Sequence, residues 1–164
     1  MNRFGAVRNL CDDSEDVDAS VTSRNLVSPA VATIFTRIID GEVPGTFVHR
    51  DERCVVFMSI NPMARGHALV VPIEEYDHWI DMPEDLVAHL FAVSHRIGRA
   101  QHRAFRCEKV GVIVAGYEVP HVHVHVIPTV TMAQLSFANA AASVDRADLE
   151  SAAEAIRAAL AAGA

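Results

Sequence analysis

Three histidines occupy alternate positions in one short segment of the chain, at His121, His123 and His125. Valines alternate with them, so an extended strand here presents imidazoles on one face and an apolar surface on the other. A single histidine in such a place is usually a polar residue on an edge strand. Strand propensity does not explain three in register, because threonine or lysine would serve a solvated face equally well. The segment therefore predicts a site that uses imidazole chemistry.

Two kinds of imidazole chemistry fit this spacing. A metal ion needs ring nitrogens at about 2.0–2.1 Å, whereas alternate strand residues lie about 6.5–7 Å apart at Cα. Two of the histidines could therefore share an ion, but three in a row would be strained and a fourth donor would have to come from elsewhere. In nucleophilic catalysis, a neutral imidazole attacks a phosphorus or acyl centre while its other nitrogen donates to a fixed acceptor. Neighbouring histidines then stabilise negative charge and carry protons. The residues alone leave both possibilities open.

Composition limits the partners of this 164-residue chain. The formal net charge is −7 and the sequence pI is about 5.6, which gives no electrostatic footprint for nucleic acid or an anionic membrane. No apolar run approaches the roughly 18 residues of a membrane helix, and no signal peptide is evident, so a cytoplasmic protein is expected. Cys11, Cys54 and Cys107 are odd in number and widely spaced, which predicts reduced thiols.

The chain divides into three predicted segments. Residues 1–30 are poor in apolar side chains and carry an acidic cluster, so a flexible leader is expected. Residues 31–130 form the domain, and residues 131–164 are a C-terminal extension with a helix beginning at Asp145 and ending by Gly163. Within the domain, the pattern predicts a short amphipathic helix ended by Gly41 and strands at 46–50, 54–60, 67–73, 111–116 and 121–128.

One long helix is expected between the third and fourth strands. Asp81 is the predicted N-cap, Glu84 completes a capping box, and the apolar stripe runs to about Arg106. His89 and the other histidines of this helix are expected to be solvated. The element order α-β-β-β-α-β-β-α with short loops predicts an antiparallel sheet with its helices on one side, an α+β fold.

Three consecutive stretches carry a resemblance to a known family. They read TIFTRIIDGEVPG, DERCVVFMSINPMARGHALVVP and EVPHVHVHVIP, and they span about residues 32–128. In order and spacing the chain resembles the histidine triad (HIT) hydrolase family, in its Hint-like branch, and most closely short actinobacterial HIT proteins. The resemblance implies a HIT-like fold with a five-stranded antiparallel sheet, one long helix and shorter helices. It also implies a homodimer formed through the long helix and the fourth strand.

The resemblance assigns roles to residues of this chain. His123 is the implied nucleophile, which attacks the α-phosphate of a purine nucleotide to give a covalent nucleotidyl-histidine that water then hydrolyses. His121 and His125 are expected to hold phosphate oxygens and orient His123, and His67 is expected close to the triad. No metal or cofactor is needed for this chemistry. The implied substrate-binding residues are Ile34, Phe35, Ile38, Phe57, Ser59, Ile60, Asn61, Gly116 and Glu118.

The chain departs from the family pattern at several positions. Ser59 stands where many members have a ribose-binding aspartate, and the loop before Gly116 is shortened and lacks a phosphate-binding asparagine. Glu118 replaces a serine or threonine and would act as a general acid only with a raised pKa. Thr33 and Thr36 stand where zinc-carrying members have paired cysteines, so no structural zinc is expected. The last triad residue, His125, is a histidine and not a glutamine, which favours the hydrolase branches over the nucleotidylyltransferase branch.

The predicted function is hydrolysis of purine nucleoside phosphoramidates, or of related esters and anhydrides, with release of a nucleoside monophosphate. Two alternatives are kept. The short loop and Ser59 would also suit a nucleotide-binding protein with little turnover. The four histidines His67, His121, His123 and His125 would suit a metal-binding protein.

Overall fold

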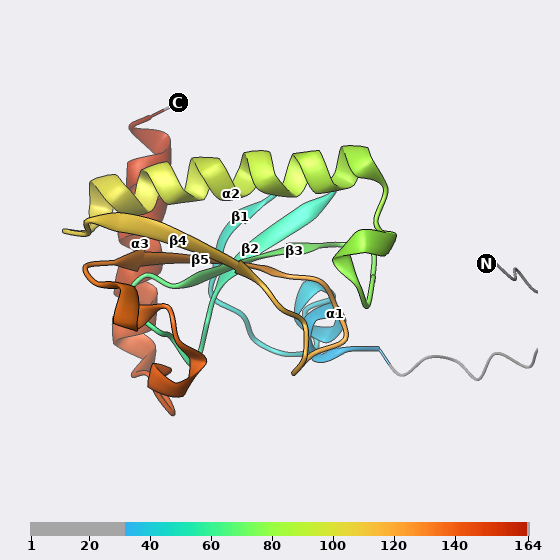
Figure 1. Cartoon of the computed structure of the whole chain (residues 1–164), viewed down its shortest axis with the longest axis horizontal. Coiled ribbons are helices and arrows are strands. Elements are labelled where there is room, and N and C mark those ends of the chain that lie inside the picture. Colours follow the sequence, from blue (N-terminus) through green and yellow to red (C-terminus); the bar gives the residue numbers. More distant parts are fainter. Residues whose placement is uncertain (1–31, 164) are drawn as a thin grey trace, which may run out of the picture. The chain divides into compact units, whose positions relative to one another are not determined.

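The structure, a computed structural model, describes residues 32–163 (Figure 1). The leader predicted at 1–30 lies outside the described residues. The helices are α1 (Ile34–Ile39), α2 (Glu84–Ala104) and α3 (Arg146–Ala161). The strands are β1 (Phe47–Arg50), β2 (Cys54–Met58), β3 (Ala68–Pro72), β4 (Lys109–Val114) and β5 (Val124–Thr129). Short 3₁₀ turns lie at Trp79–Asp81, Met132–Gln134 and Phe137–Asn139.

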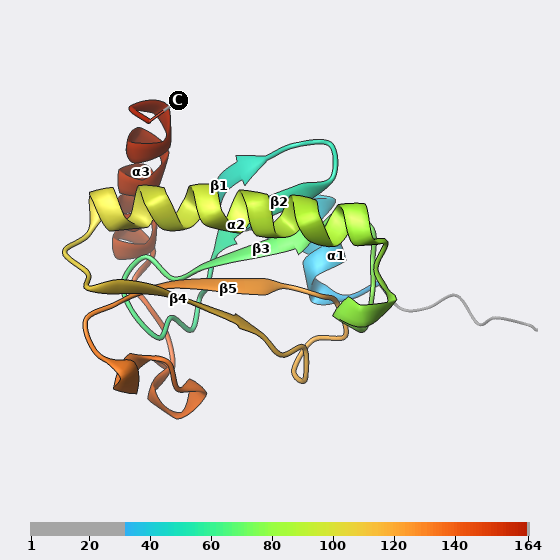
Figure 2. The same ribbon diagram turned by 45° about the horizontal axis from the view of Figure 1, so that its top comes forward.

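The five strands form one antiparallel sheet in the order β1-β2-β3-β5-β4 (Figure 2). Leu69 of β3 lies opposite Phe57 on β2 and opposite His125 on β5. Directly opposed residues of antiparallel strands share a face of the sheet. The predicted α+β class and the HIT-like five-stranded sheet are therefore confirmed, and the register places His125 on the same face as Phe57.

Helices cover both faces of this sheet, so the expectation that they lie on one side was wrong. One face packs on α2 and α3 and carries Cys54, Val56 and Val70. The other face packs on α1, whose Phe35 and Ile39 contact a cluster of four strand residues, namely Val55, Phe57, Leu69 and Val71. Every residue of β2 and β3 is buried. Such uninterrupted apolar strands need a cover on each side, as in sheets buried on both faces.

The bounds of several elements differ from the sequence prediction, including β4, which lies two residues earlier than predicted, and the starts of α2 and β5. Helix α2 begins at Glu84 after Pro83, and Asp81 belongs to the preceding 3₁₀ turn, so Asp81 is not the N-cap. Pro83 starts the helix because its carbonyl accepts from the backbone N–H groups of the next turn, at Leu86 and Val87. Strand β5 begins at Val124, three residues after the predicted start. Within residues 32–163, no helix is long and apolar enough to cross a lipid bilayer.

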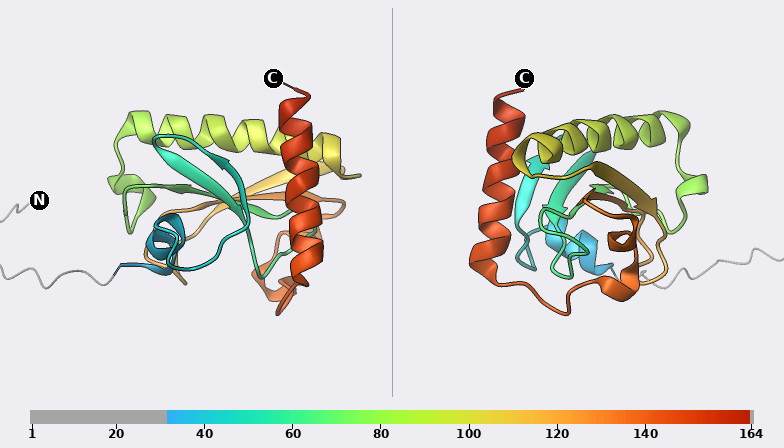
Figure 3. Two further views of the ribbon diagram at one scale, coloured as in Figure 1. Left: turned by 180° about the vertical axis from the view of Figure 1, so that it is seen from behind. Right: turned by 60° about the vertical axis from the view of Figure 1, so that its left-hand side comes forward.

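The C-terminal helix is an integral part of the core. Asp145 caps α3 as predicted, since its carboxylate accepts from the Ala147 N–H at 2.8 Å. The apolar face of α3 enters the core beside α2 through Leu149, Ala152, Ala153 and Ile156. Figure 3 shows α3 crossing the end of α2 at one side of the sheet. The extension therefore contributes to folding as well as to the surface around the site.

Gly66 is expected to be the glycine least tolerant of substitution. It has φ +92°, and a Cβ there would lie 2.3 Å from the ring of Phe105. We expect Gly66→Ala to lower the free energy of unfolding by about 3 kcal/mol, because backbone strain and overpacking add. Gly41→Ala is the matched control, since Gly41 has φ +80° with no atom within 4 Å of its added Cβ. Equal losses for both variants in urea unfolding would contradict this account.

Candidate active site

His123 has one ring nitrogen committed to the backbone. Its Nδ1 lies 2.8 Å from the carbonyl oxygen of His121. A carbonyl only accepts hydrogen bonds, so Nδ1 carries the proton and donates it, which leaves a lone pair on Nε2. Burial, as the largest cause, lowers the pKa of His123 below its usual value and favours this neutral form. His123 therefore has the tautomer and charge of a nucleophile.

A relay of hydrogen bonds fixes the opposite tautomer on His125. The backbone N–H of Met63 donates to Nδ1 of His67 at 3.2 Å, so the proton of a neutral His67 is on Nε2. This N–H donates to Nδ1 of His125 at 2.9 Å. Neutral His125 then carries its own proton on Nε2. The relay leaves His125 with an N–H donor at Nε2, whereas His123 has a free acceptor at Nε2.

The positions of the two imidazoles make this difference useful. The rings of His123 and His125 lie with centroids 4.7 Å apart and edge to face. Both side chains border the same cavity. A phosphoryl group between them can be attacked by one imidazole while the other donates to an oxygen that gains negative charge.

His121 is placed differently from the expectation. Its ring is fully buried, its Nε2–H donates to the carbonyl of Pro72 at 2.9 Å, and its Nδ1 accepts from the Thr33 hydroxyl at 3.0 Å. Both ring nitrogens are therefore occupied, and the side chain has no N–H left for a phosphate oxygen. His121 acts as a positioning residue, since its main-chain carbonyl holds His123.

The two threonines at the start of α1 anchor His121. Thr33 Oγ1 also accepts from the Thr36 N–H at 3.2 Å, and Thr36 Oγ1 donates to the carboxylate of Glu75 at 2.5 Å. The bond from Thr36 is the main cause that lowers the pKa of Glu75. Hydroxyl groups are not among the cysteine, histidine and carboxylate ligands of structural zinc sites. Thr33 and Thr36 therefore do not fit a structural zinc site, and they make hydrogen bonds to His121 and Glu75.

A cavity of about 730 Å³ opens beside the histidines. Its wall contains eight of the nine predicted substrate-binding residues, namely Ile34, Phe35, Ile38, Phe57, Ser59, Ile60, Asn61 and Glu118. His67, His123 and His125 also border it. The ring of Phe35 packs edge-on against Phe57 at 5.4 Å and against His123 at 4.9 Å. An apolar pocket thus adjoins the polar reacting end, as in typical small-molecule sites.

Comparison with known proteins identifies the family. The model of the HIT domain matches residues 40–132, which is more than half of the chain. This chain belongs to the HIT family. The matched span contains the RGH turn with His67 and the whole triad, so the family assignment includes the four histidines whose geometry is described above.

Three relatives show how far the similarity of this HIT protein extends. An uncharacterized HIT-like protein of Methanocaldococcus jannaschii is 37% identical over 101 residues, covering 58% of this chain and 77% of that protein. Adenylylsulfatase HINT3 of Arabidopsis thaliana is 28% identical over 123 residues, covering 72% of this chain and 61% of that protein. The crystal structure of a hypothetical histidine triad nucleotide-binding protein from Sulfolobus tokodaii superposes with a TM-score of 0.69 at 25% identity, covering 78% of this chain and 91% of that chain.

Two predicted site residues have other contacts in this HIT domain. Gly116 has φ +79° and is absent from the cavity wall, which fits a turn glycine rather than a phosphate contact. Asn61 borders the cavity, but its Nδ2 donates to the carbonyls of Ala141 and Ala142 at 3.2 and 2.7 Å. Asn61 thereby fastens the C-terminal extension over the site.

The C-terminal extension supplies a wall that the sequence analysis missed. Phe137 packs edge-on against His125 with ring centroids 5.2 Å apart. The rest of this wall consists of Ala140, Ala141, Ala142, Val144, Arg146 and Leu149. Arg146 places a cation beside the cavity of the HIT domain. Phe137 is the one aromatic residue after residue 130, which was the available signal, but its segment lies outside the family resemblance.

The buried histidines predict a loss of stability in acid. Burial, with His123 as the next cause, lowers the pKa of His67 from 6.5 to about 4 and that of His125 to about 3. Below pH 6.5 the unfolded chain binds more protons at these histidines than the folded chain does. The free energy of unfolding is therefore highest above pH 6.5, and it falls as the pH decreases toward 4 and 3. Urea unfolding should show a loss on the order of 2 kcal/mol per histidine between about pH 7 and 5.

The control for this prediction removes one titrating ring. His67→Gln keeps an N–H donor but cannot titrate, so its unfolding free energy should depend less steeply on pH than that of the wild type. Identical pH dependences for the two proteins would show that His67 is not held neutral by the fold.

Proposed function

We propose that this HIT protein hydrolyses purine nucleoside phosphoramidates, or related esters and anhydrides, at the α-phosphate and releases a nucleoside monophosphate. One observation carries the proposal: the free acceptor on His123 lies beside the donor on His125, at one end of an apolar cavity. The family and the adenylylsulfatase relative support it.

In the first step, Nε2 of neutral His123 attacks the α-phosphorus. The new P–N bond forms as the bond to the leaving group breaks, and the electron pair of that bond goes with the leaving group. His123 becomes an imidazolium, which the carbonyl of His121 stabilises through the Nδ1–H bond. The Nε2–H of His125 donates to a phosphoryl oxygen as negative charge develops.

In the second step, water attacks the phosphorus of the nucleotidyl-histidine. The P–N bond to His123 breaks, its electron pair returns to Nε2, and the proton of the water is lost to solvent or a nearby base. The monophosphate leaves and the starting tautomer of His123 is restored. The residues of this chain supply the nucleophile, its orientation and the hydrogen-bond donor for this cycle.

The apolar side of the cavity suits a purine base. Phe35 and Phe57 offer aromatic surfaces, and Ile34 is 41% exposed at the edge of α1, where a flat ring can cover it. Ser59 is buried at the cavity and offers a hydroxyl to the ribose. A neutral hydroxyl binds a ribose less tightly than a carboxylate does, so base stacking supplies more of the affinity.

Leaving-group choice depends on two charged residues at the cavity, Glu118 and Arg146. An anionic leaving group such as sulfate would be attracted to Arg146. An amine leaving group must acquire a proton, which water can supply at the open cavity, and Glu118 borders the place where that transfer occurs. We therefore include both adenosine phosphoramidate and adenylyl sulfate as substrates.

The test is steady-state release of AMP from these two substrates by the full chain in the presence of a chelator. Turnover of either substrate at a rate well above that of the His123→Ala variant is the expected result. Nucleotide binding without turnover of any substrate would contradict the proposal and favour a nucleotide-binding protein. Zinc that is bound by the wild type and lost in the His123→Ala variant would favour the alternative of a metal-binding protein that uses the four histidines.

We also propose that the protein acts as a homodimer through α2 and β4. Strand β4 is at the edge of the sheet, with its outer side unpaired among the described residues. Val112 on this strand and Phe91 on α2 are 47% and 44% exposed. An unpaired edge beside exposed apolar side chains is a surface that pairing with a second copy would cover.

A further inference from the structure

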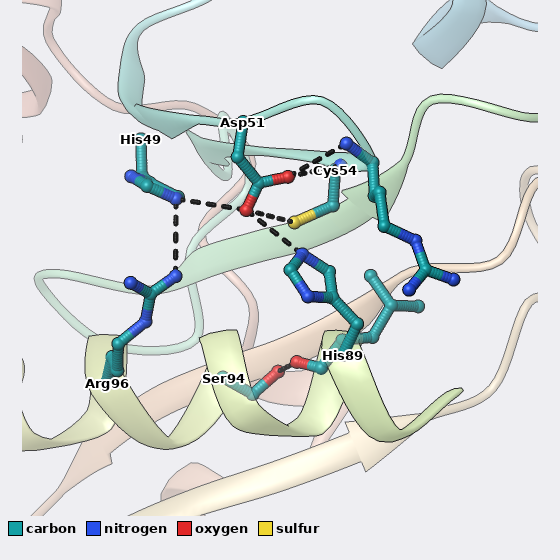
Figure 4. A network of polar contacts seen from close by, with 8 residues as sticks. His49, Asp51, Cys54, His89, Ser94 and Arg96 are labelled. Atoms are coloured by element: carbon teal, nitrogen blue, oxygen red, sulfur yellow. Dashed lines mark hydrogen bonds and ion pairs between the residues drawn. The ribbon is translucent and has the colours of Figure 1, made fainter. Parts of the chain in front are cut away.

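A second cluster of side chains with metal-binding chemistry lies around Asp51 (Figure 4). Asp51 is in the turn between β1 and β2, Cys54 opens β2, and His89 projects from α2. The expectation that His89 is solvated was wrong, because its Nε2–H donates to the Asp51 carboxylate at 3.0 Å. The hydrolysis proposed above does not use any of these three residues.

The donor atoms of the three residues have the spacing of ligands around one ion. Asp51 Oδ2, Cys54 Sγ and His89 Nε2 all lie within 4.8 Å of one another. From Asp51 Oδ2, the distance is 3.0 Å to His89 Nε2 and 3.7 Å to Cys54 Sγ. Tetrahedral zinc, with nitrogen and oxygen at about 2.0–2.2 Å and sulfur at about 2.3 Å, separates its ligand atoms by about 3.3–3.7 Å. Small side-chain shifts would therefore admit the ion.

The turn aims Asp51 at this cluster. Its Oδ1 accepts from the backbone N–H groups of Arg53 and Cys54, both at 2.9 Å. The other oxygen, Oδ2, is thereby turned toward Cys54 and His89. Hydrogen bonds of this kind that orient a ligand are typical of metal sites, where they reduce the cost of ordering it.

The site is open on one side. Cys54 is fully buried, whereas the side chains of Asp51 and His89 are 26% and 29% exposed. His49 Nε2 lies 3.3 Å from Asp51 Oδ2 on this side, with the guanidinium of Arg96 at 3.5 Å from His49. An ion can enter from solvent, and His49 is the nearby side chain that could approach it. The side chain of Arg96 can turn away from His49 because this residue is exposed.

Metal binding at these residues requires the loss of one proton, from the thiol of Cys54. Burial, followed by the charge of Asp51, raises the pKa of Cys54 to about 12, so the thiol is protonated in the absence of metal. Binding a divalent ion releases this proton as the thiolate–metal bond forms. His89 stays neutral, with its proton moved from Nε2 to Nδ1. A carboxylate, a thiolate and an imidazole together are a donor set that suits zinc.

We propose that Asp51, Cys54 and His89 bind one zinc ion, which fixes the β1–β2 turn to α2. The site is on the sheet face that packs on α2, as the position of Cys54 in that core shows. The catalytic His125 is in register with Leu69, on the opposite face. The zinc therefore stabilises the domain without taking part in the proposed hydrolysis, and the two proposals fail independently.

The experiment measures zinc binding to the full chain, purified with a reductant in metal-depleted buffer. His89→Gln and Asp51→Asn are the test variants, and Asp51→Asn retains the oxygen that caps the turn. His95→Gln, an exposed histidine on the same helix, and Cys107→Ser are the matched controls. We expect one zinc per wild-type and control chain, a higher Tm with zinc, and affinity at least about tenfold weaker in the test variants.

Cobalt provides a second readout that depends on the sulfur ligand. Wild-type protein loaded with Co²⁺ should show a thiolate-to-cobalt charge-transfer band and intense tetrahedral d–d bands, and Cys54→Ser should lose the charge-transfer band while Cys107→Ser keeps it. Failure of the wild-type protein to bind zinc would overturn the proposal. Zinc retained in His89→Gln but lost in His123→Ala would place the ion at the triad and would equally overturn it.

Discussion

Replacing His123 with alanine or glycine is expected to lower kcat for AMP release by at least about 10⁴-fold, the size of effect seen when a catalytic nucleophile is removed. The reason is chemical, because Nε2 of His123 is the lone pair that the backbone bond to His121 leaves free at the cavity. Affinity for AMP should change little, since the base pocket is apolar and stays intact. Steady-state release and equilibrium binding of AMP measure the two quantities.

The glycine variant provides an internal control. His123→Gly leaves room for free imidazole, which should restore part of the activity, whereas it should not activate the wild type. His95→Ala, on the outer face of α2, should retain wild-type kcat because this histidine is exposed and remote from the cavity wall. Turnover by His123→Ala close to that of the wild type would remove His123 from the mechanism.

Substituting His67 by leucine is expected to reduce kcat by about 10²–10³-fold with little change in KM. His67 donates to Nδ1 of His125 and so keeps the proton of His125 on Nε2, where it can reach a phosphoryl oxygen. Without this donor, His125 can move its proton to Nδ1 and present a lone pair to the negative charge. The loss belongs to the transition state, since the charge on that oxygen grows as the P–N bond forms.

A glutamine at the same position separates the relay from packing. The side-chain amide of His67→Gln can still donate to His125 Nδ1, so this variant should recover a substantial part of the activity that leucine loses. Far-UV circular dichroism of both variants would confirm that the fold is retained. If glutamine and leucine gave the same kcat, His67 would act through packing and not through the tautomer of His125.

Local periodicity predicted most of the fold. The apolar runs of β2 and β3 and the cap at Asp145 are patterns that a few neighbouring residues determine. The alternation of histidine and valine also predicted a strand, but β5 contains only His125 of the three histidines. Asp81 failed as an N-cap because Pro83, two residues later, sets the first helical turn. Which face of a sheet a helix covers depends on residues far apart in sequence, so the position of α1 could not be read from its own pattern.

The site was predictable as a set of residues, but its hydrogen bonds were not. The resemblance predicted that His67 lies close to the triad, and the structure adds the hydrogen-bond relay that starts at the Met63 N–H. The hydrogen bonds that occupy both ring nitrogens of His121 were not predictable, because alternation places side chains on a face without showing which polar groups they meet. The wall formed by Phe137 and the cluster at Asp51 join segments that only the folded chain brings together.

The most direct test of the central claim is detection of the nucleotidyl-histidine itself. Wild-type protein would be mixed with adenosine phosphoramidate, quenched in base during turnover because phosphohistidine bonds are acid-labile, and analysed by mass spectrometry of the peptide that contains the triad. The account predicts an adenylyl adduct on His123 that forms and decays at rates consistent with kcat. An adduct on His121 or His125, or turnover with no adduct on any histidine under these conditions, would contradict covalent catalysis by His123.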